Sequence, residues 1–87
     1  MIKAWHDLAW EDYLYWQQVD KKTLKRINRL ITDIERNGYH CTGSPEPLKG
    51  NLRGYWSVRI DKANRIVFRI QDTVLEIIEC GGHYSRY

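Results

Sequence analysis

Several common signatures are missing from this 87-residue chain, and each absence excludes a class of protein. Its two cysteines, Cys41 and Cys80, lack CxxC spacing, whereas small secreted domains stabilised by disulfides usually carry more cysteines. Its apolar runs have at most four residues, far fewer than the roughly 20 that a membrane-spanning helix needs. No charged and apolar leader segment opens the chain. We therefore expect a cytoplasmic protein with two free thiols and no membrane partner.

Motifs for metal and nucleotide chemistry are also missing. The sequence has no Gly-rich phosphate loop, no HExxH and no Gly-x-Ser-x-Gly, which excludes the usual nucleotide hydrolases, zinc proteases and serine hydrolases. The histidines and cysteines lack the spacing of metal ligands. We therefore predict that the protein uses neither a metal ion nor an organic cofactor.

The residues that are present indicate one small folded domain over residues 1–87. Hydrophobic residues make up 43% of the chain, far more than a disordered segment contains. Charge is uneven: one Lys against four acids in residues 1–20 gives −3, and six basic residues against Asp61 in residues 49–69 give +5. Concentrated positive charge is typical of surfaces that bind phosphate, although a solvated face carries it equally well.

Two helices are predicted in the first half of the chain. The first has Asp7 as its cap and ends near Gln18. Its apolar stripe is Trp10, Tyr13, Leu14 and Gln17 or Val19. The second has Asp20 as its cap and ends at Gly38. Its apolar stripe is Leu24, Ile27, Leu30, Ile31 and Ile34. The short turn between the helices predicts an antiparallel hairpin.

Strands are predicted on both sides of these helices. Residues 2–5 form a short first strand, and residues 39–54 form a loop in which two prolines hold Glu46 extended. From Tyr55 onward apolar residues alternate, and a last strand covers residues 74–80. The apolar faces of the two middle strands align only if the loop between them has three or five residues. That register places Arg59 and Arg65 together on the opposite face.

This order of elements predicts an α+β fold: an N-terminal strand, a two-helix hairpin and then an antiparallel sheet, with the helices covering one sheet face. The other face is expected to be cationic and aromatic, as in sheets that bind RNA. It carries Tyr55, Arg59, Arg65 and Arg69.

Cleavage of RNA without a metal needs a base, a cation at the phosphate and an acid for the leaving oxygen. Glu46, Arg65 and His83 supply these three groups, since a carboxylate accepts a proton, Arg is permanently charged and His titrates near neutrality. Spacing alone does not bring the three residues together, and scattered surface positions remain the alternative.

Several ordered motifs resemble the YoeB/Txe toxins, which are RelE-like mRNA interferases of bacterial toxin–antitoxin modules. The motifs are Trp10–Trp16, Lys25–Ile31, Pro45-Glu46-Pro47-Leu48-Lys49, Trp56-Ser57-Val58-Arg59-Ile60, Asn64-Arg65-Ile66-Val67-Phe68 and His83-Tyr84. The likeness runs in unbroken order from Met1 to Tyr84.

The resemblance implies a RelE-like microbial RNase fold and ribosome-dependent cleavage of mRNA in the A site, leaving a 2′,3′-cyclic phosphate. It implies Glu46 as general base, Arg65 as the residue that stabilises the transition state and His83 as general acid. It also implies substrate contacts by Lys49, Arg59 and Tyr84. The partners that it implies are a YefM/Axe-like antitoxin, the ribosome and mRNA in a bacterial cytoplasm, with the choice between monomer and homodimer left open.

Three features depart from the family pattern. Members often carry two arginines where this chain has Val58-Arg59, and a basic residue where it has Gly81. Both differences are expected to remove positive charge near the site. The residues Ser85-Arg86-Tyr87 extend beyond the usual His-Tyr ending and are expected to crowd it.

Two other functions remain open at this point. One is a catalytically weak module that binds RNA or the ribosome and is neutralised by an acidic antitoxin. The other is a structural partner whose basic face only binds the antitoxin. The presence of Glu46, Arg65 and His83 together favours the endoribonuclease over both. A second-helix patch is a candidate ribosome-binding surface, and its residues are Lys22, Lys25, Arg26 and Arg29.

Overall fold

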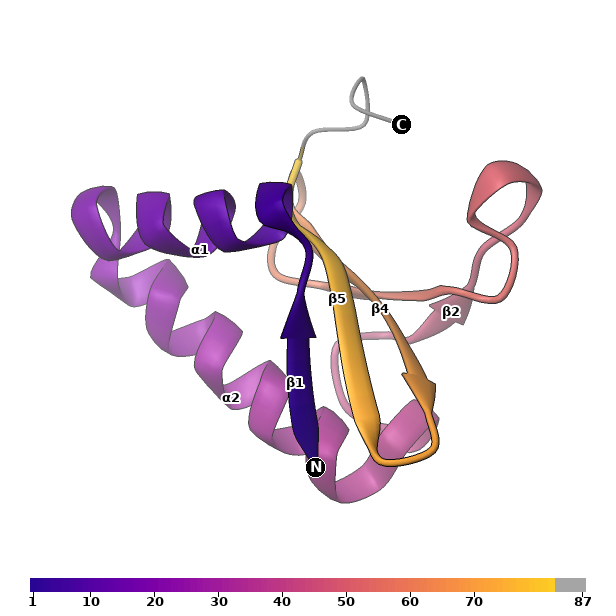
Figure 1. Ribbon diagram of the computed structural model, residues 1–87. Coiled ribbons are helices and arrows are strands. Elements are labelled where there is room, and N and C mark those ends of the chain that lie inside the picture. Colours follow the sequence, from indigo (N-terminus) through magenta and orange to yellow (C-terminus); the bar gives the residue numbers. More distant parts are fainter. Residues whose placement is uncertain (83–87) are drawn as a thin grey trace.

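The computed structural model describes residues 1–82 and shows a five-stranded sheet with two helices packed on one face (Figure 1). Along the chain the elements are β1 (Ile2–Trp5), α1 (Asp7–Val19), α2 (Lys21–Asn37), the 3-10 turn η1 (Gly38–His40), β2 (Glu46–Pro47), the 3-10 turn η2 (Gly50–Leu52), β3 (Trp56–Arg59), β4 (Arg65–Gln71) and β5 (Val74–Gly81). The α+β fold is therefore confirmed.

The sheet has the strand order β1-β5-β4-β3-β2. β1 pairs in parallel with β5, and the other neighbouring strands are antiparallel, so the sheet is mixed. The predicted order of strand, two helices and antiparallel strands is correct. The short strand β2 lies inside the segment that we expected to be loop only, and its pairing with β3 places Glu46 at the edge of the sheet.

α2 has the cap and the apolar stripe that its sequence predicts. Asp20 accepts hydrogen bonds from the Thr23 backbone N–H and hydroxyl at 3.1 and 2.7 Å. Gly38 closes the helix with a φ of 59°, a left-handed conformation that glycine adopts without strain. The buried residues of the helix are Ile27, Leu30, Ile31 and Ile34. They pack on the sheet and form the centre of the core.

α1 presents a different face to the core from the one predicted. Its buried residues are Ala9 and Asp12, whereas Trp10, Leu14 and Val19 are 44%, 41% and 55% exposed. The prediction failed because α1 is apolar on more than one side, so the sequence does not define a single stripe. Asp7 is also not the cap, because His6 occupies that position, and its side chain makes no capping hydrogen bond.

The predicted helical hairpin is present, and Tyr13 donates a hydrogen bond across it to Asn28 Oδ1 at 2.7 Å. Figure 1 shows the two helices diverging from their shared turn as an open V rather than lying closely antiparallel.

The register of β3 and β4 is the predicted one. Trp56 pairs with Phe68 and Val58 with Ile66, so the apolar side chains of both strands face the helices across a five-residue loop, residues 60–64. Arg59 pairs with Arg65 on the opposite face. We call this opposite side of the sheet the open face.

A bulge in β5 shifts which of its residues point toward the helices. The apolar residues in its sequence therefore do not alternate regularly between the two faces. Val67 pairs with Glu79 but Phe68 pairs with Ile77, so Ile78 is an extra residue. Leu75, Ile77 and Cys80 therefore all reach the core, although they do not alternate regularly. The same bulge leaves Glu79 beside Val67 on the open face.

Candidate active site

β2 fixes Glu46 on the open face. Glu46 pairs with Ser57, and directly paired residues of antiparallel strands point to the same side of the sheet. Proline on either side keeps the backbone extended, and Pro47 is tolerated because β2 is an edge strand. The side chain of Glu46 is exposed, and within residues 1–82 it forms no ion pair.

A cleft of about 320 Å³ joins Glu46 to the two arginines on the open face. Its lining residues are Glu46, Ser57, Arg59, Asp61, Lys62, Asn64 and Arg65. Three predicted site residues are thus brought together: Glu46, Arg59 and Arg65. Lys49 is exposed and does not belong to the described lining of this cleft. His83 and Tyr84 lie outside the described residues, as does the tail Ser85-Arg86-Tyr87.

Arg65 is held by a buried carboxylate that the sequence did not suggest. Its Nε donates to Glu79 Oε2 at 2.9 Å, and the side chain of Glu79 is fully buried while that of Arg65 is 19% exposed. The β5 bulge brings Glu79 to this position, and bulges leave no reliable signal in a single sequence. The ion pair fixes the orientation of the Arg65 guanidinium at the cleft.

The loop between β3 and β4 forms one wall of the cleft. Asp61 Oδ1 accepts hydrogen bonds from the backbone N–H groups of Ala63 and Asn64, each at 2.8 Å. Partial burial works to raise the pKa of Asp61, but hydrogen bonds from the Asn64 side chain and these N–H groups outweigh it and lower the pKa. The sequence predicts only a turn here and does not place Lys62 and Asn64 in the cleft.

The positive charge of Arg69 on the open face is largely neutralised by an ion pair, which the sequence did not indicate. Its Nη2 lies 2.6 Å from Glu76 Oε1, and its guanidinium stacks over the Tyr55 ring at 4.6 Å from the ring centroid. Glu76 also contacts His6 Nε2 at 2.6 Å and accepts from Tyr55 Oη at 3.2 Å. Two acids of β5 therefore offset the charge of two arginines of β4.

The pKa values in this cluster follow from its contacts. Partial burial acts to raise the pKa of Glu76, but hydrogen bonds from His6, Arg69 and Tyr55 outweigh it and lower the pKa. The hydrogen bond to Glu76 raises the pKa of Arg69. Burial and the neighbouring Glu76 raise the pKa of Tyr55.

The two positions at which this chain lacks a basic residue of the family pattern, Val58 and Gly81, lie on different faces of the sheet. Val58 is fully buried against the helices, so the expectation that it removes charge from the site is wrong. Gly81 pairs with Arg65 and lies on the open face, so a basic side chain there would stand beside Arg65.

The candidate ribosome-binding cations of α2 lie close to the cleft. Arg26 Nη2 donates to the Arg59 carbonyl oxygen at 3.3 Å. A hollow of about 260 Å³ lies between α2 and the β3–β4 loop, and Asp61 lines both this hollow and the cleft. Its basic lining residues are Lys22, Arg26 and Arg29. Lys25 is exposed on the same helix, and within residues 1–82 none of the four α2 cations forms an ion pair.

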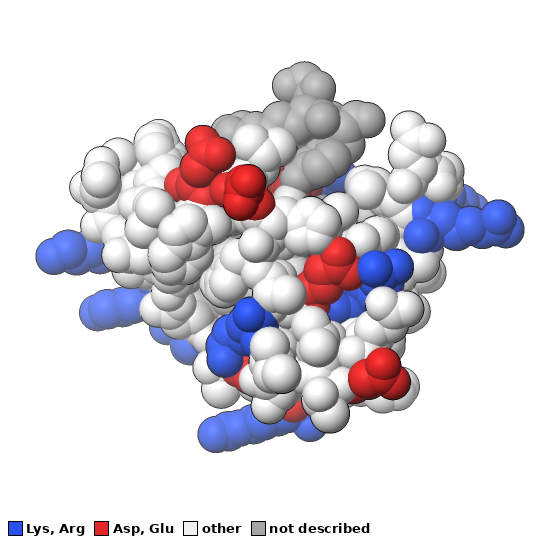
Figure 2. Space-filling view, viewed as in Figure 1, with Lys and Arg blue, Asp and Glu red and all other residues white. Residues whose placement is uncertain are grey.

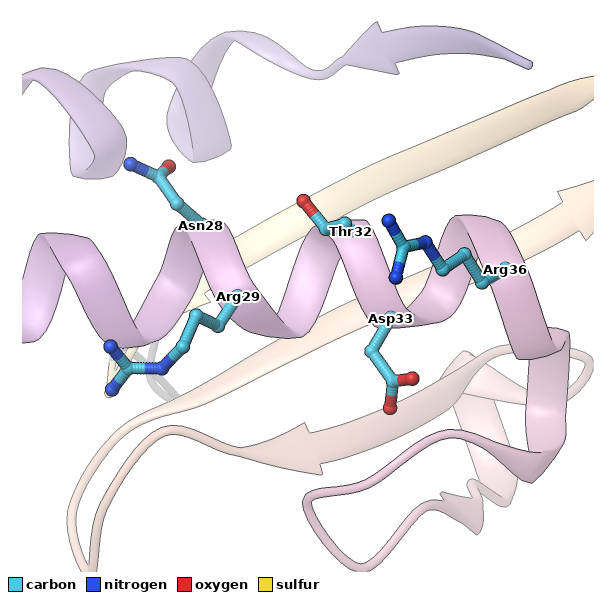
Figure 3. Close-up of a pocket in the computed structure, with 5 residues that line it drawn as sticks. All are labelled: Asn28, Arg29, Thr32, Asp33 and Arg36. Atoms are coloured by element: carbon cyan, nitrogen blue, oxygen red, sulfur yellow. The ribbon is translucent and has the colours of Figure 1, made fainter.

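A second hollow, of about 410 Å³, continues along α2 (Figure 3). Asn28, Arg29, Thr32, Asp33 and Arg36 line it. Figure 2 shows that the two helices differ in charge, with basic side chains projecting beside α2 and acidic side chains over the N-terminal half of α1.

Other chemistry finds little support in the described part of the chain. Both cysteines are buried free thiols, and burial together with Asp12 and Glu79 raises the pKa of Cys80 far above its ordinary value. Among residues 1–82, no three His, Cys, Asp or Glu side chains are grouped so that they could hold a metal ion. None of the described helices is long and apolar enough to cross a membrane.

Known proteins resemble this chain over nearly its whole length. A model of YoeB-like toxins of bacterial type II toxin–antitoxin systems matches residues 5–84. Toxin YoeB of Synechocystis sp. is 54% identical over 83 residues, which cover 95% of this chain and 96% of that protein. Toxin YoeB of Escherichia coli (strain K12) is 48% identical over 84 residues, which cover 97% of this chain and all of that protein, 100%.

Solved structures show the same relationship. The YoeB/ParE toxin from Agrobacterium tumefaciens matches with a TM-score of 0.92 and 41% identity over 97% of this chain and 100% of that chain. A chain of the heterotetrameric YoeB–YefM toxin–antitoxin complex from Staphylococcus aureus matches with a TM-score of 0.89 and 44% identity over 97% and 98%. The YoeB dimer from the same organism matches with a TM-score of 0.88, 44% identity and the same coverage.

Proposed function

This chain belongs to the YoeB-like toxins of bacterial type II toxin–antitoxin systems, and on that premise we propose that it is an endoribonuclease that cleaves mRNA in the ribosomal A site. The observation that carries the proposal is the cleft, in which a carboxylate, Glu46, faces the same space as Arg59 and Arg65. A base and two permanent cations around one cavity suit attack on a phosphodiester.

In the proposed reaction Glu46 takes the proton from the ribose 2′-hydroxyl. The 2′-oxygen then bonds to the adjacent phosphorus, and the bond from phosphorus to the 5′-oxygen breaks. Arg65, oriented by Glu79, stabilises the charge that develops on the phosphoryl oxygens, with Arg59 and Lys62 beside it. His83 gives a proton to the departing 5′-oxygen. The products are a 2′,3′-cyclic phosphate and a 5′-hydroxyl end.

Two further residues are proposed to hold the substrate. Lys49 follows β2 outside the described lining of the cleft, and it would contact a phosphate next to the one that is cleaved. Tyr84 would stack on a base of the mRNA, since aromatic rings bind unpaired bases in this way.

The ribosome is proposed to align the mRNA in the cleft, in the bacterial cytoplasm where translation takes place. Alignment of the 2′-oxygen with the leaving oxygen lowers the barrier by several kcal/mol in favourable cases. The α2 cations Lys22, Lys25, Arg26 and Arg29 are proposed to bind ribosomal RNA, because they are not consumed in ion pairs within residues 1–82 and adjoin the cleft.

A YefM-type antitoxin is the proposed protein partner, since this chain matches a chain of a YoeB–YefM complex over nearly its full length. An acidic segment of such a partner would cover the cationic cleft and block cleavage. The match with a YoeB dimer makes a homodimer the proposed assembly of the free toxin.

The test is cleavage of mRNA on programmed ribosomes under single-turnover conditions. We expect Glu46→Ala and His83→Ala each to slow cleavage by about 10²–10⁴-fold, as for loss of one proton-transfer group. Glu35→Ala, which removes an acid on α2 that pairs with Lys3, is the control and should cleave normally. Wild-type rates in both variants would reject these roles. Ribosome binding without any cleavage by the wild type would instead identify a binding module.

A further inference from the structure

The end of β5 is held by side chains of α1 rather than by another strand. β1 stops at Trp5, which pairs with Ile77, so within the described sheet β5 has no strand on that side beyond this point. The Cys80 backbone N–H donates to Asp12 Oδ2 at 3.2 Å. The Cys80 carbonyl oxygen accepts from Trp16 Nε1 at 2.8 Å. α1 therefore satisfies both backbone groups of a residue that lies three positions before His83.

Packing alone does not explain the presence of Asp12. Its side chain is only 3% exposed, and burial of a carboxyl group costs free energy that an apolar side chain would not cost. The hydrogen bond to Cys80 offsets part of that cost. Because Asp12 and Trp16 are four residues apart on one helix face, the two contacts fix both the position and the direction of the Cys80 peptide.

Gly82 fixes the same segment from the other side. A Cβ atom at Gly82 would lie 2.4 Å from the Ala63 carbonyl oxygen and 3.0 Å from Asn64 Oδ1. Ala63 and Asn64 belong to the β3–β4 loop, which is itself held by hydrogen bonds to Asp61, and both Asp61 and Asn64 line the cleft. The chain therefore leaves β5 between α1 and the wall of the cleft, and the next residue is His83.

We propose that Asp12 and Trp16 are positioning residues for the general acid, an inference that rests on the proposed function. They hold the Cys80 peptide, three residues before the proposed general acid His83 in the sequence, and neither side chain is proposed to contact the substrate. A general acid acts only within hydrogen-bond reach of its target, about 2.6–3.2 Å, so a small displacement of its backbone lowers the rate many-fold.

A change of leaving group separates this role from general damage to the protein. In the ordinary linkage the bond from phosphorus to the 5′-oxygen breaks, and that oxygen takes a proton from the acid. In a substrate with sulfur in place of that oxygen, the phosphorus–sulfur bond breaks and the electron pair leaves as a stable thiolate. The sulfur substrate therefore still needs the base and the cations, but it does not need the general acid.

Two substitutions remove one contact each. Trp16→Phe keeps a ring but loses the N–H donor, and Asp12→Leu loses the acceptor. On programmed ribosomes we expect each to slow cleavage of the oxygen substrate about 10–100-fold, because part of the contribution of the general acid is lost. Cleavage of the sulfur substrate should change by less than about 3-fold. Asp12→Asn keeps an acceptor oxygen and should cleave both substrates nearly as wild type.

Matched controls come from the exposed side of the same helix. Trp10→Phe repeats the loss of the indole N–H, and Glu11→Leu repeats the replacement of a carboxylate by an apolar side chain, both at exposed positions, and both rates should be unchanged. His83→Ala should lose cleavage of the oxygen substrate and retain that of the sulfur substrate. Thermal unfolding of every variant shows whether it is folded, and if Asp12→Leu is not, Trp16→Phe decides the question.

The outcomes distinguish this inference from the proposed function. Equal losses on both substrates for Trp16→Phe, or no loss on either, would overturn the positioning role while His83→Ala still behaves as an acid variant. If the sulfur substrate fails to rescue His83→Ala, then His83 is not the general acid, and the positioning role falls with that assignment.

Discussion

The acids of β5 determine what the arginines of β4 can do. Arg65 and Arg69 lie on the same face of one strand, and each is bound by a carboxylate of the neighbouring strand, Glu79 or Glu76. The two ion pairs differ in burial, since the side chain of Glu79 is fully buried whereas that of Glu76 is 19% exposed. An arginine held in this way keeps its charge and loses its freedom to rotate, which suits stabilisation of a transition state at a fixed position.

Removal of the Glu79 carboxylate should therefore reduce both stability and cleavage. We expect Glu79→Gln to lower the free energy of unfolding by about 1–3 kcal/mol, less than for a fully buried pair because Arg65 is partly solvated. Urea denaturation measures this change, and single-turnover cleavage on ribosomes should slow in parallel. Glu76→Gln is the matched control and should cost less stability, because its pair with Arg69 is more exposed. Equal effects of the two substitutions would contradict the distinction.

The loop that presents Glu46 is anchored to α2 at its beginning. Asp33 on the fourth turn of α2 accepts hydrogen bonds from the backbone N–H and the hydroxyl of Thr42, and Asn37 donates to it at 2.6 Å. These hydrogen bonds, that of the Thr42 N–H first, lower the pKa of Asp33 below its ordinary value of 3.8. Gly43 and Ser44 follow with positive φ angles of 91° and 55° and turn the chain toward β2.

This anchor predicts a dependence of stability on pH. Because the pKa of Asp33 is lower in the folded state, its contribution is fully present above the ordinary value of 3.8 and is lost as pH falls through the lowered pKa. Asp33→Asn should therefore have a lower Tm than wild type near pH 6, and the two Tm values should converge in acid. Asp72→Asn, at an exposed turn position with a φ of 55° that Asn also adopts, is the control and should follow wild type throughout. A difference in Tm between Asp33→Asn and wild type that stays constant from pH 6 into acid would contradict the prediction.

Elements with one clear pattern could be predicted from the sequence, and elements with competing patterns could not. The apolar stripe of α2 and the alternation of β3 and β4 each allow a single arrangement. Because the apolar side chains of both strands must face the core, the register that pairs Arg59 with Arg65 follows. α1 carries aromatic residues on several sides, so tertiary packing decided which of them is buried. The bulge at Ile78 was equally hidden, and with it the carboxylate that holds Arg65.

The candidate site shows the same division. The residues Glu46, Arg59 and Arg65 were found through motifs and register, and they line one cleft. Lys62, Asn64 and Ser57 were missed because their position depends on the shape of a loop and on pairing with an edge strand of two residues. Such contacts leave no periodic signal in the sequence.

At the scale of the whole molecule, charge is divided between two neighbouring surfaces. The cleft holds three cations and two acids, and the adjoining hollow on α2 holds three cations and one acid that is shared, Asp61. The first surface suits a reaction at one phosphate, whereas the second has no partner acids of its own and suits contact with many phosphates. If the proposed function is correct, docking on the ribosome and cleavage should therefore respond differently to charge removal.

Substitution of Lys22, Lys25 and Arg29 by Gln tests this separation and spares Arg26, whose guanidinium contacts the strand of the cleft. We expect weaker ribosome binding and a shallower dependence of the affinity on salt, with the log–log slope reduced by about 2–3 for three lost phosphate contacts. Weak cleavage of free RNA should be unchanged, because none of the three residues lines the cleft. A control with Lys3, Arg36 and Arg53 replaced by Gln removes the same charge outside the patch of Lys22, Lys25, Arg26 and Arg29 and should keep most of the salt dependence. If the two triple variants bind ribosomes equally well at every salt concentration, the patch of Lys22, Lys25, Arg26 and Arg29 is not the docking surface and the contact must be made elsewhere.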